Sequence, residues 1–273
     1  MGQSHKGEML GILGGMGPLA SAEFLKTIYE SNIVGQREQK SPKVIVYSDP
    51  TLPDRTEALL RGDYNTLLEQ LIGALYKLCE LDVDKIVICC VTSHYLLPKL
   101  PYELRDRVIS LVDIIFKKIL ERQQKYLLIC STGTCKLGIF QNHILWQFVQ
   151  DYIILPDEND QNLIHQMIYY LKSNGKYEKC VPILEQLEIK YNIQKFIAGC
   201  TEIHLLNKNL KKIKGEIKKS VFLDPLMIIA EELWSISVLQ EYTNLPNTIA
   251  CFKLLSQILS PDFHEIKLVG KYH

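Results

Sequence analysis

The chain has 273 residues, of which 47% are hydrophobic, a length that suits two domains of ordinary size. Its 31 basic and 31 acidic residues give a formal net charge of zero, and no basic stripe with interleaved aromatic residues is present. A nucleic-acid partner is therefore not expected. No apolar run approaches the roughly 18 residues of a membrane span, and the N-terminus lacks the pattern of a secretory signal. We expect a cytoplasmic protein that neither crosses nor binds a membrane.

In the first half of the chain, short apolar runs alternate with segments of helical periodicity. The runs predict strands at 9–13, 43–47 and 85–90. Helical spacing predicts a helix over 64–81, and Pro18 is well placed in the first turn of another. We expect a proline-stiffened loop at 51–56 and, after the third strand, a helical segment and a short apolar run at 108–111.

The second half repeats this alternation. Strands are predicted at 126–130 and 195–200, with a further apolar run at 221–225, and helices are predicted at 131–149, 157–171, 177–191 and 226–240. Uniformly apolar strands that alternate with helices indicate an α/β fold with parallel sheets covered on both faces. Such sheets bind ligands beyond the carboxyl ends of their strands. Residues 243–273 are expected to be an appended segment that packs on the first domain.

Two of the predicted strands end in a cysteine with a similar surrounding sequence. Cys90 closes one apolar run and Cys200 closes another, and each is followed four positions later by a histidine, His94 or His204. Cys89 should point to the opposite face of its strand, because side chains alternate along a strand. This duplication predicts two thiols that reach one site from opposite sides. Such a pair suits chemistry that needs a proton acceptor on one face and a proton donor on the other.

The eight cysteines show no paired framework, so we expect free thiols rather than disulfides. Cys89, Cys90 and His94 are close in sequence, but the chain has no CxxC pair and no second pair of ligands at a usual spacing. A metal site is therefore not predicted.

Several polar or glycine-rich segments could hold an anion, and each also has a purely structural reading. The backbone amides of 14–17 could approach a carboxylate, or could form only a tight strand-to-helix turn. The hydroxyls of 131–134 could bind a carboxylate or cap a helix. Arg55 could grip a carboxylate with its planar fork or be solvated, and Lys172 could complement a helix dipole.

Taken in order, these motifs resemble those of the aspartate/glutamate racemase family, whose members need no cofactor and use two cysteines. The resemblance covers roughly residues 9–242, and aspartate racemase is the most similar type. It rests on Gly11–Pro18, Pro53–Thr56, Cys90–His94, Thr132–Thr134, Ile168–Lys172 and Gly199–Glu202. Each motif is common by chance, but all of them in this order are specific.

The resemblance implies two pseudo-symmetric, Rossmann-like α/β domains with parallel sheets and the active site in the cleft between them, usually in a homodimer. We assign residues 9–114 and 225–273 to the first domain and residues 115–224 to the second. The implied reaction is interconversion of L- and D-aspartate, with glutamate as a second choice. One thiolate would remove the α-proton, and the other cysteine, as a thiol, would return a proton to the opposite face.

The resemblance also implies roles for residues at the matching positions. Cys90 and Cys200 would be catalytic. Substrate-binding roles fall to Gly15, Met16, Arg55, Val91, Thr92, Thr132, Thr134, Lys172 and Thr201. His94, Glu202 and His204 would support the site.

One departure from the family pattern concerns Val91, which stands where the family usually has asparagine. Losing a polar partner of the substrate would cost about 1–3 kcal/mol. Two alternatives therefore stay open. One is isomerisation or decarboxylation of a small dicarboxylate by the same superfamily architecture, and the other is a weakly active or non-catalytic protein that binds an acidic amino acid.

Overall fold

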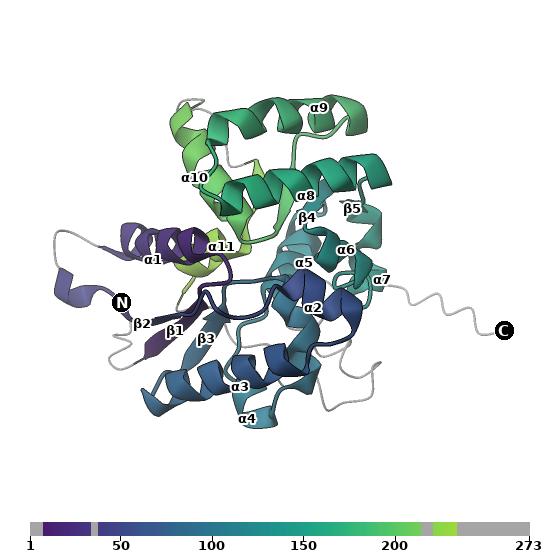
Figure 1. Ribbon diagram of the computed structural model, residues 1–273. Coiled ribbons are helices and arrows are strands. Elements are labelled where there is room, and N and C mark those ends of the chain that lie inside the picture. The colour runs from purple at the N-terminus through teal and green to yellow at the C-terminus, as the bar shows by residue number, and fades with distance from the viewer. Residues whose placement is uncertain (1–7, 34–37, 214–220, 234–273) are drawn as a thin grey trace, which may run out of the picture.

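The computed structural model describes residues 8–33, 38–213 and 221–233, and these residues form two α/β lobes (Figure 1). The first lobe is built on a three-stranded parallel sheet of order β2-β1-β3, and the second on a four-stranded parallel sheet of order β5-β4-β6-β7. The predicted α/β class with parallel sheets is confirmed. The predicted segment 243–273 lies outside the described residues.

The first lobe follows the predicted strands closely. Its elements, with the helix that leads out of it, are β1 (Met9–Gly14), α1 (Pro18–Asn32), β2 (Lys43–Ser48), α2 (Arg55–Arg61), α3 (Asn65–Glu80), β3 (Lys85–Ile88), the 3-10 helix Thr92–Lys99, α4 (Tyr102–Arg105) and α5 (Leu111–Arg122). Of the run at 108–111, Val108 alone pairs with the sheet, through one parallel bridge to Ile86.

The second lobe has the same strand order as the first. Its elements are β4 (Tyr126–Cys130), α6 (Thr132–Lys136), α7 (Trp146–Val149), β5 (Ile153–Ile154), α8 (Glu158–Lys172), α9 (Val181–Tyr191), β6 (Phe196–Gly199), α10 (Glu202–Ile213) and β7 (Phe222–Leu223), and α11 (Pro225–Glu231) follows. The two sheets correspond strand by strand: β5 takes the place of β2, β4 that of β1, and β6 that of β3. β7 takes the place of the single bridge at Val108. The lobes are therefore pseudo-symmetric, although the domain boundaries assigned from the sequence remain a prediction.

Two predictions about helices were wrong for identifiable reasons. The continuous helix predicted over 131–149 is two short helices, because Gly138 adopts a left-handed conformation (φ 61°) just after α6, and Asn142 donates a hydrogen bond to the Leu137 carbonyl. The loop predicted at 51–56 ends early, because the Asp54 carboxylate accepts a hydrogen bond from the Glu57 amide and so begins α2 at Arg55.

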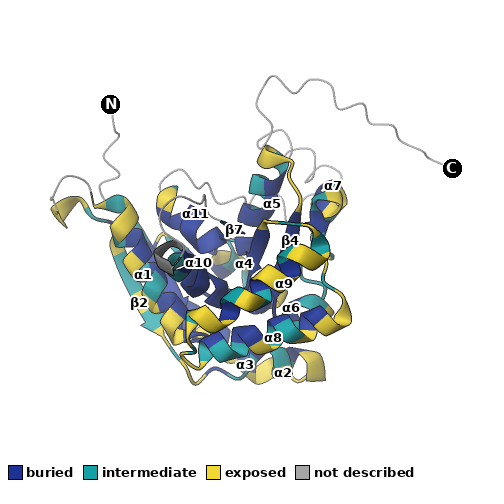
Figure 2. Ribbon diagram, turned by 90° about the horizontal axis from the view of Figure 1, so that it is seen from above, coloured by how far each residue is buried: buried dark blue, intermediate teal, exposed yellow. Residues whose placement is uncertain are grey.

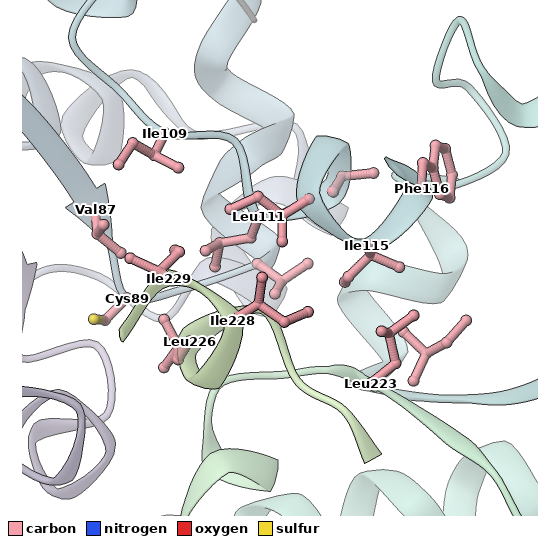
Figure 3. Packing of buried hydrophobic residues seen from close by; sticks show 14 of the residues in the cluster. Val87, Cys89, Ile109, Leu111, Ile115, Phe116, Leu223, Leu226, Ile228 and Ile229 are labelled. Atoms are coloured by element: carbon pink, nitrogen blue, oxygen red, sulfur yellow. The ribbon is translucent and has the colours of Figure 1, made fainter. Parts of the chain in front are cut away.

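The two lobes share one apolar cluster. It contains Leu10 and Ile12 of the first sheet and Leu128 and Ile197 of the second, and its centre is formed by side chains of α5 and α11. Figure 3 shows Leu226, Ile228 and Ile229 of α11 between the strand that carries Val87 and the α5 residues Leu111, Ile115 and Phe116. Two further clusters fill the outer layers, one in each lobe.

The helices that face outward are amphipathic. In Figure 2, α3, α8 and α9 show exposed residues on one side and buried residues on the other. This pattern is the expected result of apolar residues recurring at helical spacing, with one stripe packed on a sheet. The buried stripes of these helices thus complete the apolar cluster of each lobe.

Candidate active site

Cys90 and Cys200 occupy equivalent positions in the two lobes. Cys90 follows β3 and Cys200 follows β6, and each of these strands lies beside the first strand of its sheet. Both cysteines are buried, with exposed fractions of 8% and 6%. Cys89 packs into the cluster shared by the lobes whereas Cys90 packs into the cluster of the first lobe, so the predicted alternation is confirmed.

The two thiols lie near each other where the lobes meet, a region that we call the interlobe junction. Burial raises the pKa of Cys200 well above its ordinary value, and the charges of Glu202 and Cys90 raise it further, opposed by Lys172. A hydrogen bond of 3.2 Å from the Thr201 hydroxyl to the Cys89 carbonyl ties the two cysteine-bearing segments together. The duplicated sequence context therefore does bring two thiols to one place.

Glu202 is a direct partner of the second cysteine. The Cys200 thiol donates a hydrogen bond of 2.8 Å to Oε2 of Glu202, and this carboxylate is 1% exposed. Its other oxygen, Oε1, is buried and has no hydrogen-bond partner within the described part of the chain. The arrangement holds Cys200 in its protonated form, and it leaves the second oxygen of Glu202 at the junction, where that oxygen can accept one more hydrogen bond.

The turn after β1 requires glycine at position 15 and leaves little room at position 17. Gly15 has a φ of 90°, and a side chain there would also collide with the backbone of Asp49. At Gly17, a Cβ atom would collide with Oε1 of Glu202. Met16, between them, is buried in the core of the first lobe, where its sulfur accepts a hydrogen bond from Ser93. The turn therefore contributes backbone, not side chains, to the interlobe junction.

Arg55 is held rigidly by backbone carbonyls. Its Nη1 donates to the carbonyls of Leu52 and Pro53, and its Nη2 donates to the carbonyl of Met16, at 2.9–3.1 Å. These bonds use three of the five N–H groups. Nε is buried and has no partner among the described residues. Nε is thus a free donor on the edge that it shares with Nη2, and it can donate to an oxygen of a carboxylate.

The predicted hydroxyl ligands form bonds across the junction. The Thr92 hydroxyl, from the first lobe, lies 3.1 Å from that of Ser131 and 2.9 Å from that of Thr134, both from the second lobe. These hydroxyls therefore bind each other as well as facing the junction. Thr132 differs, because its backbone amide donates to His165 while its buried hydroxyl has no partner in the described segments.

Lys172 is the cation that faces the two thiols. Burial would lower the pKa of its ammonium, but the charges of Glu202, Cys200 and Cys90 outweigh burial and raise it. The ammonium group also lies 4.5 Å from the centre of the Tyr169 ring. Lys172 thus stays charged and interacts electrostatically with both cysteines, and its substrate-binding role stays a prediction.

His94 has a structural role in the first lobe. Its Nε2 accepts a hydrogen bond from the Leu111 amide, so the proton is on Nδ1, which donates to the Cys90 carbonyl at 3.0 Å. Burial lowers the pKa of His94 to about 4. The ring is therefore neutral near pH 7, and it joins the segment after β3 to the start of α5.

Acid is expected to destabilise the protein through His94. The unfolded histidine binds a proton below about pH 6.5, whereas the folded one does so only near pH 4, so unfolding takes up a proton in this interval. The stabilisation is complete above pH 6.5 and is lost as the pH falls toward 4. Between pH 7 and pH 5 we expect His94 to cost about 2 kcal/mol of unfolding free energy. Urea titrations of wild type and His94→Gln at both pH values measure it, and an equal loss in the two proteins would contradict it.

His204 is also bonded on both sides, away from the thiols. Nδ1 donates to the Asp224 carboxylate at 2.7 Å, and Nε2 lies 2.9 Å from the Thr27 hydroxyl. Burial would raise the pKa of Asp224, but the charge of His204 and the hydrogen bonds from His204 and Asn207 bring it below its ordinary value. This buried group joins α10 and the start of α11 to α1.

The structure places the Val91 side chain in the apolar core. Its side chain is 1% exposed and packs in the apolar cluster shared by the lobes, beside Cys89. Val91 therefore offers the interlobe junction its backbone alone. The departure from the family pattern places an apolar side chain in an apolar environment, so the sequence change and its surroundings agree.

Two contacts at the junction were not predicted from the sequence. Tyr169 of α8 donates a hydrogen bond to Asp54 at the start of α2. Tyr169 lies in the motif that was noted for Lys172, and Asp54 lies in the motif that was noted for Arg55. Cys135 is half-buried beside Cys130, and a hydrogen bond from Cys130 lowers its pKa to about 7. Neither contact has a sequence signal of its own, because each depends on how the chain folds back.

Among the described residues, no helix is long and apolar enough to cross a membrane. Within the same residues, no group of three or more histidine, cysteine, aspartate or glutamate side chains is arranged to hold a metal ion.

Comparison with known proteins gives the class of the molecule. The family model described as Asp/Glu/Hydantoin racemase matches residues 13–233. The broad specificity amino-acid racemase RacX of Bacillus subtilis is 25% identical over 214 residues, covering 77% of this chain and 90% of that protein.

Solved structures of similar proteins share the fold. An aspartate racemase from Picrophilus torridus has a TM-score of 0.66 with 21% identity, covering 82% of this chain and 91% of that one. A glutamate racemase from Campylobacter jejuni has a TM-score of 0.51 with 18% identity, covering 92% and 98%. An allantoin racemase from Klebsiella pneumoniae has a TM-score of 0.53 with 14% identity, covering 87% and 91%. These likenesses concern the two-lobed architecture.

The chain belongs to the Asp/Glu/hydantoin racemase family. Its class of activity is amino-acid racemisation.

Proposed function

We propose that this protein interconverts L- and D-aspartate by proton transfer between the substrate and two thiols, Cys90 and Cys200. The observation that carries the proposal is the equivalent placement of these cysteines in two pseudo-symmetric lobes. Lys172 interacts electrostatically with both of them. A racemase must remove hydrogen from one face of a carbon atom and return it to the other. Two acid–base groups from opposite lobes suit that requirement.

The structure favours a protonated starting state for one of the two thiols. Cys200 donates its hydrogen to Glu202 and has a raised pKa, so it begins as the proton donor. Cys90 then acts as the base, and its thiolate takes the α-proton of the enantiomer whose α-hydrogen faces it. As that proton leaves, Cys200 delivers its own to the opposite face, and Glu202 remains beside the new thiolate. The reverse reaction uses the same two groups with their roles exchanged.

The difficult part of the reaction is the weak acidity of the α-hydrogen. Charge that develops on the α-carboxylate must be stabilised by groups already in position. Lys172 stays charged at the junction, and the backbone after β1, from Gly15 to Gly17, approaches the same region. The two thiols carry both proton transfers, so the proposal assigns no cofactor.

An acidic substrate is favoured by the two cations. Arg55 keeps a buried Nε without a partner among the described residues while both of its terminal nitrogens donate to carbonyls, and such a fixed cation suits a carboxylate. Lys172 supplies a second positive charge. Glutamate is the second candidate, and the name of the Bacillus subtilis relative supports testing a wider set of amino acids.

Incubation of the protein with L-aspartate in D2O tests this proposal. We expect loss of optical rotation together with incorporation of deuterium at the α-carbon, because the proton returned by Cys200 comes from solvent. D-aspartate and both enantiomers of glutamate should be assayed in parallel. The proposal fails if no acidic amino acid shows either change.

The same assay separates the alternative chemistry. Isomerisation or decarboxylation of a dicarboxylate would appear as turnover of maleate or of a malonate without turnover of aspartate. The homodimer and the cytoplasmic location remain predictions from the sequence, and sedimentation of the purified protein checks the first of them.

A further inference from the structure

One side-chain hydrogen bond joins the lobes beside the two cations. The Tyr169 hydroxyl donates to Oδ2 of Asp54 at 3.0 Å, between residues 115 positions apart in sequence. Tyr169 belongs to α8 of the second lobe, and Asp54 precedes α2 of the first lobe. Helices α2 and α6 also pack against each other at this place, where Gly133 of α6 lies against Thr56. In Figure 1, α2 lies close to α6.

Each partner of this bond lies next to one of the cations. Asp54 caps α2 through its other oxygen, which accepts from the Glu57 amide at 2.9 Å, and the next residue is Arg55. The Tyr169 ring lies under the ammonium group of Lys172, which is one helical turn further along α8. The bond therefore connects the element that begins with Arg55 to the side chain that packs against Lys172.

The bond is strengthened by charge. Burial would raise the pKa of Asp54, but hydrogen bonds from the Glu57 amide and from Tyr169, with the charges of Arg55 and Lys172, bring it below its ordinary value. The carboxylate is therefore ionised near pH 7. A hydroxyl that donates to an ionised carboxylate makes a stronger bond than one between two neutral groups.

We propose that Tyr169 is a positioning residue that fixes the spacing between Arg55 and Lys172 across the junction, and thereby selects the length of the acidic substrate. This inference rests on the proposed function for the identity of the substrate. With the bond intact, the two cations keep one separation and fit one side-chain length. Without it, α2 and α8 can move apart, so the shorter substrate is held less well and the longer one is rejected less strongly.

Tyr169→Phe tests the proposal, since it keeps the ring under Lys172 and removes only the hydroxyl. We expect KM for aspartate to rise about threefold to tenfold, the range that one hydrogen bond supplies, while kcat changes less than twofold. The preference for aspartate over glutamate, as a ratio of kcat/KM values, should fall by a similar factor. A change in kcat alone, or an unchanged preference, would overturn the proposal.

Tyr170→Phe is the matched control. Tyr170 is the next residue on α8, and its hydroxyl accepts a hydrogen bond of 3.0 Å from the Lys176 amide inside the second lobe. Its loss removes a tyrosine hydroxyl without touching the first lobe, so KM and preference should stay within twofold of wild type. Equal effects in the two variants would mean that α8 is merely loosened, and would overturn the positioning role.

Asp54→Ser tests the same bond from the other lobe. Serine remains a good helix cap but has only one oxygen, which the Glu57 amide occupies, so Tyr169 loses its bond to residue 54 and keeps only its hydrogen bond with Thr56. The double variant Asp54→Ser, Tyr169→Phe should be no more than twofold worse than the worse single variant, because both remove one interaction. Multiplied effects would contradict the proposal.

Amide hydrogen exchange separates this proposal from the proposed function. In the protein without substrate, the backbone of 54–61 should exchange faster in Tyr169→Phe than in Tyr170→Phe, because α2 loses its attachment to the second lobe. If wild type racemises no acidic amino acid, the proposed function fails, and the exchange rates still decide whether Tyr169 holds the lobes together. Equal exchange in the two variants would overturn that role as well.

Discussion

Replacing either Cys90 or Cys200 with serine is expected to lower racemisation of aspartate by about 10²- to 10⁴-fold, the usual contribution of a positioned acid–base group. Serine is close in size to cysteine, so the fold should survive, but its hydroxyl is far too weak an acid to replace the thiol. The two substitutions should be similarly damaging although Cys200 alone is bound to Glu202, because each turnover uses both groups. Polarimetry of L- and D-aspartate measures the loss.

Exchange of the substrate α-hydrogen with solvent tests the role of each thiol separately. Each single variant keeps one thiol on one side of the α-carbon. In D2O, Cys200→Ser should therefore incorporate deuterium into one enantiomer without inverting it, and Cys90→Ser should do so with the other enantiomer. Cys79→Ser, on α3 of the first lobe, is the matched control and should racemise as wild type does. A single variant that keeps full activity would contradict the two-thiol mechanism.

Val91→Asn is expected to lower the free energy of unfolding by about 1–3 kcal/mol, the cost of burying an amide without partners. The valine side chain is 1% exposed and lies among apolar residues of both lobes. Introducing the asparagine that is usual in the family should therefore not raise kcat/KM in this chain. Urea unfolding and the aspartate assay together measure the two effects.

The control for this substitution is Val46→Asn on strand β2. Val46 is 37% exposed, so the same change there should cost less than about 1 kcal/mol, within the range of strand propensities. A gain of activity in Val91→Asn without loss of stability would show that position 91 faces the substrate, contrary to its packing in the structure.

The sequence predicted every described strand except β5, and the positions of the two thiols after strands, because these signals are local. The runs that end at Cys90 and Cys200 are apolar throughout, and alternation alone separates Cys89 from Cys90. Helix α2 was missed although a usable signal was present, since Asp54 followed three residues later by Glu57 is a capping pattern.

The remaining features of the site depend on contacts between distant segments. Nothing local indicates that Tyr169 reaches Asp54, or that the Thr92 and Thr134 hydroxyls meet across the lobes. The packing of Val91 was also invisible, because a residue next to a catalytic position can face the core as easily as the ligand. Motifs in linear sequence identify which segments meet, whereas the direction of each side chain is set by the folded chain.

The apolar cluster that contains side chains from both sheets has a consequence for how the chain folds. Helices α5 and α11 supply its centre, and the first of them leads out of one lobe while the second follows the last strand of the other. Neither half of the polypeptide can complete this cluster alone. Fragments produced by dividing the gene between α5 and β4, near residue 124, should therefore be insoluble when expressed separately and recover native structure when expressed together, and the intact chain should melt in a single transition.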